Sequence, residues 1–239
     1  MLAVELRQVL SQVPRLPKQA THELVATVLR EAITRGLLKA NQPLPQDEIA
    51  AQLRVSHIPV REALRQLQSE GLVAYQPNRG ATVSALTPDE IREIYEIRAI
   101  LETAAVRRAA PRLGAERLAR AAAILDQAEQ ATDAATWGAL DVAFHQCIYD
   151  LDDRPRLREL IDGLLRRVDR YWLTHGLMLR DRRDFDREHR DLLEALSRRD
   201  AEQAAARLER HLAGASERLA MALEQVPDDR PVAAAASER

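Results

Sequence analysis

The chain has 239 residues, enough for one large domain or two small ones. Hydrophobic residues make up 46% and charged residues 30%, a balance that excludes a disordered chain and allows a sizeable core. Only 3% of the residues are aromatic and only eight are glycine, whereas the helix-favouring Ala, Leu, Arg and Glu are abundant. The composition therefore predicts a mostly α-helical protein.

Membrane proteins, secreted proteins and disulfide-bonded proteins are excluded by simple features of the sequence. No run of 18 apolar residues is present, so no transmembrane helix is expected. The first 15 residues include Glu5 and Arg7 and lack the apolar stretch of a secretory signal. Cys147 is the single cysteine, which excludes an intramolecular disulfide and a zinc finger. We expect a cytoplasmic protein that does not bind membranes.

The net charge of −2 conceals an uneven distribution along the chain. Residues 1–84 contain ten Lys and Arg against seven Asp and Glu, whereas the remaining residues contain 25 against 30. This split is typical of a part that binds a polyanion followed by an acidic part. An excess of three charges also arises by chance, so sequence motifs must decide whether the first part binds a polyanion.

Three segments of different character are expected: a first domain over residues 14–84, a helical domain over residues 87–223 and a disordered tail over residues 226–239. The start of the second domain has the pattern of a helix N-terminus. Thr87 is the expected N-cap, proline follows at the first helical position, and Glu90 is the capping-box partner.

The first domain is predicted to contain three helices followed by a β-hairpin. Ser56 is expected to cap the third helix and Gly71 to end it. A turn containing Asn78 and Gly80 joins the two strands. The predicted elements, in chain order, are helices over residues 21–38, 46–53 and 56–70 and strands over residues 72–75 and 81–84.

This order of elements is that of a winged helix-turn-helix, a DNA-binding fold. The N-terminus of the third helix can enter the major groove, where Arg61 and Arg65 reach phosphates or guanine edges. Arg79, at the hairpin tip, can contact an adjacent groove. The alternative is that both helical arginines lie on an ordinary solvated face, and the complete pattern argues against it.

The string DEIAAQLRVSHIPVREALRQLQSEGLVAYQPNRGATV, residues 47–83, resembles the GntR family of bacterial transcription regulators. Two positions depart from the family pattern: Asn41 lies near the place of a usual glycine, and many members have arginine at the position of His57. The DNA-binding residues that the resemblance implies are Ser56, His57, Pro59, Arg61 and Arg65 on the recognition helix and Arg79 in the wing.

The second domain is predicted to be an antiparallel bundle of amphipathic helices. Their expected spans are residues 88–112, 115–130, 135–151, 155–171, 182–197 and 200–223.

Four side chains in this bundle have the types and spacing of a metal site. Asp141 and His145 lie four residues apart and therefore share a helix face. His189 and His211 lie roughly 15–18 Å on either side of a turn, so antiparallel helices bring both to one level. Such ligands suit Zn²⁺, Ni²⁺, Mn²⁺ or Fe²⁺ and leave one or two positions open. We expect no metal binding by the other histidines, which have only a surface or packing role: His22, His57 and His175.

Residues 87–223 also resemble the FadR-type ligand-binding domain, called FCD. The strings DEIREIYEIRAILE, DVAFHQCIYD and EHRDLLEALSRRDAEQAAARLERHL carry this resemblance. It implies that Asp141, His145, His189 and His211 together bind a divalent metal ion, as in the metal-binding members. Members of this group commonly sense small organic acids, so the resemblance also implies a small carboxylate effector.

Arg98 is the first candidate to bind that effector. An arginine can clamp a carboxylate that also ligates a metal. Arg98 faces inward if Ile94, Ile97 and Leu101 do. A structural ion pair with Glu102, four residues on, is an equally open interpretation.

Tyr171 and Trp172 are candidates to line the effector pocket, although aromatic side chains on a helix more often belong to the core. Cys147 lies two residues after His145 and therefore points away from it. We interpret this cysteine as a small packed hydrophobic residue.

Three functions fit these features. The working hypothesis is a ligand-responsive transcription regulator, not an enzyme, that represses by binding double-stranded operator DNA as a homodimer, because one winged-helix unit reads one half-site. A helical metallohydrolase with Glu188 as base is opposed by the DNA-binding domain and by the lack of a second carboxylate cluster. The third possibility is a DNA-binding regulator with a purely structural metal.

Overall fold

The structure is a computed structural model that describes Leu6, Val9, Gln12 and residues 20–76, 80–174 and 180–225. It separates into two compact units, the first ending at Thr87 and the second spanning Pro88–Gln225. The predicted tail over residues 226–239 lies outside the described residues. No helix among those described is both long and apolar enough to cross a membrane.

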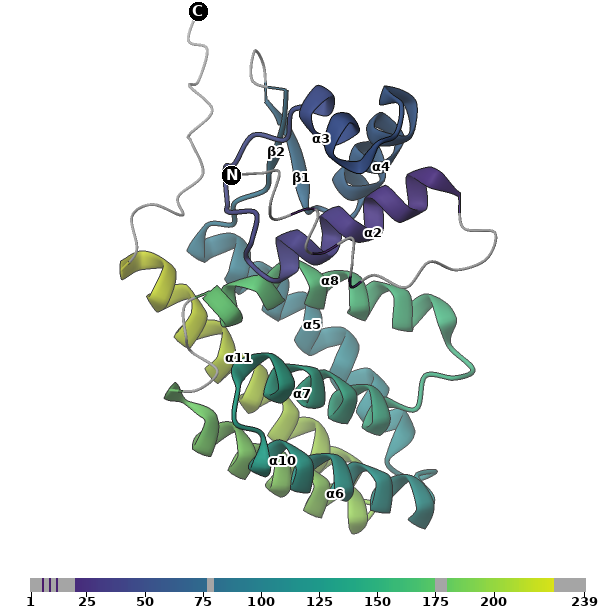
Figure 1. The fold of residues 1–239 in the computed structure, drawn as a ribbon. Coiled ribbons are helices and arrows are strands. Elements are labelled where there is room, and N and C mark those ends of the chain that lie inside the picture. The colour runs from purple at the N-terminus through teal and green to yellow at the C-terminus, as the bar shows by residue number, and fades with distance from the viewer. Residues whose placement is uncertain are drawn as a thin grey trace, which may run out of the picture. The chain divides into compact units, whose positions relative to one another are not determined.

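The first unit contains the predicted helix-turn-helix and wing (Figure 1). The two strands pair antiparallel, with Val73 opposite Val83 and Gln76 opposite Gly80. The prediction of a mostly helical protein with an N-terminal winged helix-turn-helix is confirmed. The elements are α2 (Thr21–Thr34), α3 (Gln46–Leu53), α4 (His57–Ser69), β1 (Val73–Gln76) and β2 (Gly80–Val83).

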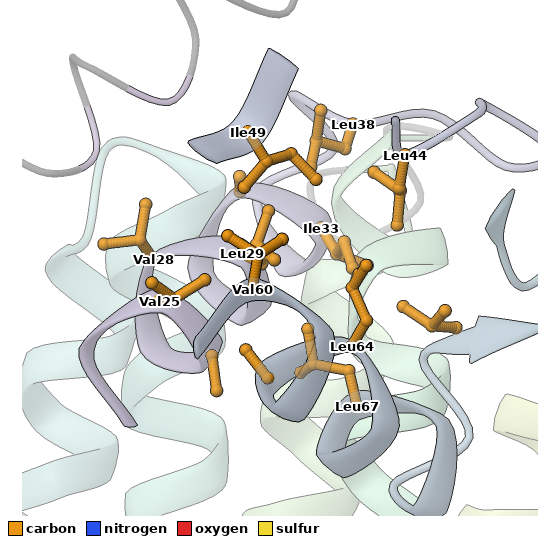
Figure 2. Close-up of a cluster of buried hydrophobic side chains, with 14 of the residues drawn as sticks. Val25, Val28, Leu29, Ile33, Leu38, Leu44, Ile49, Val60, Leu64 and Leu67 are labelled. Carbon is orange, nitrogen blue, oxygen red and sulfur yellow. The ribbon is translucent and has the colours of Figure 1, made fainter. Parts of the chain in front are cut away.

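The core of the first unit forms where the apolar stripes of α2 and α4 meet (Figure 2). The stripe on α2 repeats at three- and four-residue intervals, as an amphipathic helix requires. Ile49 of α3 and Leu44, which precedes α3, add to the same cluster. The packed residues of the two long helices include Val25, Val28, Leu29 and Ile33 on α2 and Val60, Leu64 and Leu67 on α4.

Helix α2 ends four residues before the predicted boundary. Gly36 has a φ of 70°, a left-handed conformation that glycine adopts at low cost and that commonly ends helices. The amides of Leu37 and Leu38 both donate to the carbonyl of Ala32. Leu38 remains fully buried, so the apolar spacing continued past the end of the helix and extended the prediction.

Asn41 takes a left-handed conformation, with a φ of 61°. Asparagine tolerates this region better than most residues, which explains why it can occur near the position where the family usually has glycine. Its amide donates to the carbonyl of Val83 at 3.0 Å, and the amide of Leu44 donates to Ala81 at 2.8 Å. The segment before α3 is thus attached to β2, and the departure from the family pattern preserves the turn.

Helix α4 begins after Ser56, whose backbone is extended as an N-cap requires. Ser56 is therefore the N-cap residue, as expected, although its side chain makes no capping hydrogen bond. Pro59 lies in the first turn, where its missing N–H removes no helical hydrogen bond. Gly71, with a φ of 75°, follows the C-terminus and ends the helix as expected.

The second unit is a bundle of helices in which α5 packs along α11 and α6 along α7, and α10 contacts both α11 and α6 (Figure 1). Asp133 caps α7 by accepting a hydrogen bond from the amide of Thr136 at 2.8 Å. The helices are α5 (Pro88–Ala109), α6 (Ala115–Gln130), α7 (Ala134–Tyr149), α8 (Pro155–Thr174), α10 (Arg182–Ser197) and α11 (Ala201–Gln225).

Candidate nucleic-acid interface and metal centre

The outer face of α4 carries the residues expected to read DNA. Ser56, His57, Arg61 and Arg65 are exposed, and Pro59 is partly exposed. Because Arg61 and Arg65 lie one turn apart, their guanidinium groups share a face. Neither arginine forms an ion pair with another residue in the described part of the chain.

Two neighbours modify this face. The Nδ1 atom of His57 lies 3.2 Å from the Oδ1 atom of Asp47 on α3, and both side chains are exposed. Such a pair is weak in water and leaves His57 available to DNA.

Ile58, which was not among the predicted residues, is 59% exposed. An exposed aliphatic side chain in the first turn of this helix suits contact with a thymine methyl group.

The structure describes the two strands of the wing but not residues 77–79 at its tip. Strands β1 and β2 form the predicted hairpin, and Tyr75 is exposed on β1. Arg79 and Asn78 lie outside the described residues, so the role of Arg79 stays a prediction.

Three histidines converge in the second unit. His145 on α7, His189 on α10 and His211 on α11 are all buried, and each offers a ring nitrogen within 4.8 Å of the other two. The structure thus brings together the three histidines that the sequence singled out. Three buried imidazoles at this separation can bind a metal ion.

Asp141 lies one turn before His145 and reaches the same cluster. Its Oδ1 atom is 3.2 Å from Nε2 of His189 and 3.8 Å from Nε2 of His145. Although 23% of the side chain is exposed, burial raises the pKa of Asp141 to about 6. A nearby cation would favour the charged form and offset this effect.

The chemical state of the cluster suits metal binding. Burial lowers the pKa of His145 and His189 well below the usual value, with further lowering by neighbouring histidines, so both rings are neutral at pH 7. Despite its proximity to Asp141, Nε2 of His189 has no hydrogen bond of acceptable geometry to the described residues. A buried nitrogen without a partner is costly, and a bound cation would satisfy it. The donor set therefore fits a divalent metal.

Aromatic side chains surround the three histidines. Trp137 stacks on His189 with ring centroids 6.3 Å apart, and Phe144 lies 5.0 Å from the same ring. Phe185 packs edge-on against His211 at 5.6 Å. These rings limit access of water to the imidazoles and explain their burial.

A carboxylate behind the cluster orients one of the histidines. Nδ1 of His211 lies 2.7 Å from an oxygen of Glu188, and the other oxygen of Glu188 accepts a hydrogen bond from Arg218 at 3.2 Å. Because a carboxylate only accepts hydrogen bonds, Nδ1 of His211 carries a proton, and Nε2 is the ring nitrogen left to face the cluster. This arrangement of carboxylate and histidine is common behind protein metal sites.

Arg98 is buried, with 4% of its surface exposed. Its Nε atom donates to Glu102 at 2.7 Å, and its guanidinium lies 4.5 Å from the centre of the Tyr95 ring. The ion pair that sequence reasoning left open is thus present. Arg98 faces inward together with Ile94, whereas Ile97, which was also used to orient it, is 40% exposed. The inward face of α5 includes Ile94 and Arg98, and Ile97 lies to one side of it.

Tyr149 connects this ion pair to the histidine cluster. Its hydroxyl donates a short hydrogen bond to Glu102 and lies 3.0 Å from Nδ1 of His145. Burial raises the pKa of Tyr149 well above its usual value, and the nearby Glu102 raises it further. The phenol therefore keeps its proton at pH 7.

Tyr171 and Trp172, the aromatic candidates on α8, are both buried. The Tyr171 hydroxyl accepts a hydrogen bond from Arg170, and Trp172 donates to the Tyr95 hydroxyl at 2.8 Å. Cys147 is also buried, and its Sγ atom lies 3.6 Å from the carbonyl of Arg117. All three side chains are packed, and contact between Tyr171 and an effector stays a prediction.

Comparison with known families matches both units. Residues 21–83 match the description "Bacterial regulatory proteins, gntR family". Residues 93–214, about half the chain, match the FCD domain. The chain belongs to the GntR family. It is a GntR regulator with an FCD domain, and the predicted resemblance to this subfamily is confirmed.

Relatives of this GntR regulator cover most of its length. The HTH-type transcriptional repressor RspR of Escherichia coli is 28% identical over 204 residues, 84% of this chain and 90% of RspR. A structure of a putative GntR regulator from Rhodococcus is similar, with a TM-score of 0.72, 27% identity and coverage of 83% of this chain and 96% of that one. The structure of E. coli McbR/YncC gives a TM-score of 0.70 at 26% identity, covering 87% and 99%.

Membership of the GntR family decides between the classes of function. The family consists of DNA-binding transcription regulators, so the metallohydrolase hypothesis is wrong. Glu188, its suggested base, is engaged by His211 and Arg218.

Sequence reasoning missed Tyr149, and it considered Glu188 only as a catalytic base and Glu102 only as the partner of Arg98. The available signal was spacing: Glu188 precedes His189, and Tyr149 follows His145 by one turn.

Proposed function

We propose that this protein is a metal-dependent repressor that a small organic acid releases from operator DNA. The observation that carries the proposal is the buried cluster of His145, His189 and His211, with an unsatisfied Nε2 atom and Asp141 beside it. A DNA-binding unit and a metal-competent bundle on one chain are the parts that such a sensor requires.

Asp141 and the three histidines would hold the divalent ion, for which Zn²⁺, Ni²⁺, Mn²⁺ and Fe²⁺ are the candidates. The bound metal would supply a positively charged coordination position for a carboxylate. Glu188 binds the Nδ1 atom of His211 and so orients the ring with Nε2 as the nitrogen that can bind the metal.

Arg98 and Tyr171 are the proposed effector-binding residues. Arg98 is a buried cation whose present partner is the carboxylate of Glu102. A carboxylate effector offers the same chemistry as Glu102, so it can compete for the guanidinium. This competition gives the effector a means of changing the packing of α5.

DNA binding is assigned to Ser56, His57, Pro59, Arg61 and Arg65 on α4. We extend this assignment to Arg79 in the wing. One α4 helix reads one half-site, so we propose a homodimer on a palindromic operator. The similar E. coli protein RspR is a transcriptional repressor, which supports the proposed sign of regulation. Since its target is chromosomal DNA, the protein is expected to act in the cytoplasm.

The decisive experiment measures metal content and DNA affinity on one purified sample. Elemental analysis gives the metal per chain, and fluorescence anisotropy follows binding to the DNA upstream of the gene during a titration with carboxylic and sugar acids. We expect about one ion per chain and one acid that lowers DNA affinity. Tight DNA binding that no acid changes would instead favour a purely structural metal.

The matched variants replace histidines inside and outside the cluster. The double variant His189→Ala/His211→Ala should lose the metal. His22→Ala, which replaces a partly exposed histidine in the first unit, should keep it. Full metal occupancy in the double variant would refute the proposed site.

A further inference from the structure

The hydrogen bonds behind His145 form a continuous chain of four buried side chains. The Nε atom of Arg98 donates to Oε1 of Glu102 at 2.7 Å, and the Tyr149 hydroxyl donates to Oε2 of Glu102. The same hydroxyl oxygen lies 3.0 Å from Nδ1 of His145. All four residues are buried, so water does not compete for these bonds.

The directions of these bonds follow from counting protons. Glu102 is paired with a guanidinium, so it is a carboxylate and accepts only. The single hydroxyl proton of Tyr149 is given to Glu102. The Tyr149 oxygen can then only accept from His145, and Nδ1 of His145 must carry the ring proton. This leaves the lone pair on Nε2, the nitrogen that lies 3.8 Å from Asp141.

We propose that Glu102 is a positioning residue of the metal centre: through Tyr149, it holds His145 in the tautomer whose Nε2 atom can bind a divalent cation. This inference rests on the metal site proposed above and adds a function to a residue two side chains away from it. Glu188 acts on His211 in the same way, by direct contact. Two glutamates on different helices thus set the tautomers of two ligands.

Glu102→Gln reverses the direction of the hydrogen bonds between residue 102, Tyr149 and His145, with almost no change in side-chain shape. The amide of glutamine donates to the Tyr149 oxygen, which turns the hydroxyl proton toward Nδ1 of His145. Nδ1 must then accept, so the ring proton moves to Nε2 and blocks metal binding. Tyr149→Phe has a milder effect, because it leaves Nδ1 without a partner and lets the ring adopt either tautomer.

Zn²⁺ affinity, measured by competition with a coloured chelator, tests this difference on the full-length protein. Changes behind metal ligands commonly cost 10–100-fold in affinity, so we expect Glu102→Gln to lie in that range and Tyr149→Phe to cost about tenfold or less. The double variant Glu102→Gln/Tyr149→Phe should bind Zn²⁺ like Tyr149→Phe alone. Glu96→Gln, an exposed change on the same helix, is the matched control.

A purely structural role for Glu102 predicts another pattern. The losses from Glu102→Gln and Tyr149→Phe would then multiply in the double variant, and that result would overturn the proposal. An unchanged affinity of Glu102→Gln would also overturn it. Circular dichroism of the metal-free variants identifies any that fail to fold.

The tautomer itself is read by long-range ¹H–¹⁵N correlation spectra of the histidine rings in the metal-free wild-type protein. A proton on Nδ1 of His145 supports the proposal, and a proton on Nε2 contradicts it. This spectrum requires neither a folded variant nor a bound metal. Failure of wild-type protein to bind Zn²⁺ at the cluster would overturn the proposed metal site, whereas the spectrum judges Glu102 separately.

Discussion

Replacing Arg61 by alanine tests the DNA-binding face in a quantitative way. The Arg61 side chain is exposed and has no ion pair to a described residue, so its removal leaves the fold intact. Substitutions at such surface positions usually change stability by no more than about 0.5 kcal/mol. Any large loss of DNA affinity in Arg61→Ala therefore reports a lost DNA contact.

The expected magnitude depends on what Arg61 contacts. Each phosphate contact adds about 0.9 to the slope of log affinity against log salt, and a dimer loses two contacts, so the slope should fall by about 1.8. When salt is raised from 50 to 200 mM, the variant should therefore lose about twelvefold less DNA affinity than the wild-type protein loses. If Arg61 instead contacts guanine, the loss is about 1–3 kcal/mol per half-site and depends on the base sequence.

The assay is anisotropy of labelled operator DNA at several salt concentrations, with Arg210→Ala as the control. Arg210 is an exposed arginine on α11, so this variant has the same change in net charge outside the DNA-binding unit. We expect the wild-type slope for the control and a lower slope for Arg61→Ala. Equal slopes and equal affinities in all three proteins would refute the assignment of α4 as the recognition helix.

Three further predictions concern stability. Leu64→Ala removes a fully buried side chain from the first unit and should destabilise it by about 2–5 kcal/mol, measured by urea unfolding followed by circular dichroism. Asn41→Val places a β-branched residue at a φ of 61° and should cost about 1–2 kcal/mol, whereas Asn41→Gly should fold with nearly wild-type stability in the same assay. Asp141→Asn should stabilise the metal-free protein at pH 7.5. Since burial raises the pKa of this carboxyl from 3.8 to about 6, its ionisation destabilises the fold progressively as pH rises through that window. The advantage of the variant, up to about 3 kcal/mol, should disappear below pH 3.8 in chelator-treated samples.

The order of elements and the convergence of the histidines could be predicted because each depends on regular spacing. Asp141 and His145 share a face through the helical period, and the short turn between α10 and α11 brings His189 level with His211. Helix ends were harder to predict. Leu38 continues the apolar period of α2, but the left-handed conformation of Gly36 ends the helix first.

The polar network around the cluster could not be predicted from spacing. The sequence places Tyr149 one turn after His145, but does not say that Glu102 of another helix lies opposite its hydroxyl. Arg98 shows the same limit, since four-residue spacing from Glu102 allowed either an ion pair or a free clamp. Which helices face each other at these positions depends on packing over the whole bundle.

The position of the two tryptophans has a practical consequence. Trp137, stacked on His189, and Trp172, against Phe185, are the only tryptophans in the sequence, and both belong to the bundle. Intrinsic fluorescence excited at the red edge of absorption therefore reports on the bundle alone. A paramagnetic ion such as Ni²⁺ at the histidines would quench Trp137, so metal loading can be followed without a label. The DNA-binding unit is silent in the same spectrum, and melting of the two units can be separated by comparing fluorescence with circular dichroism.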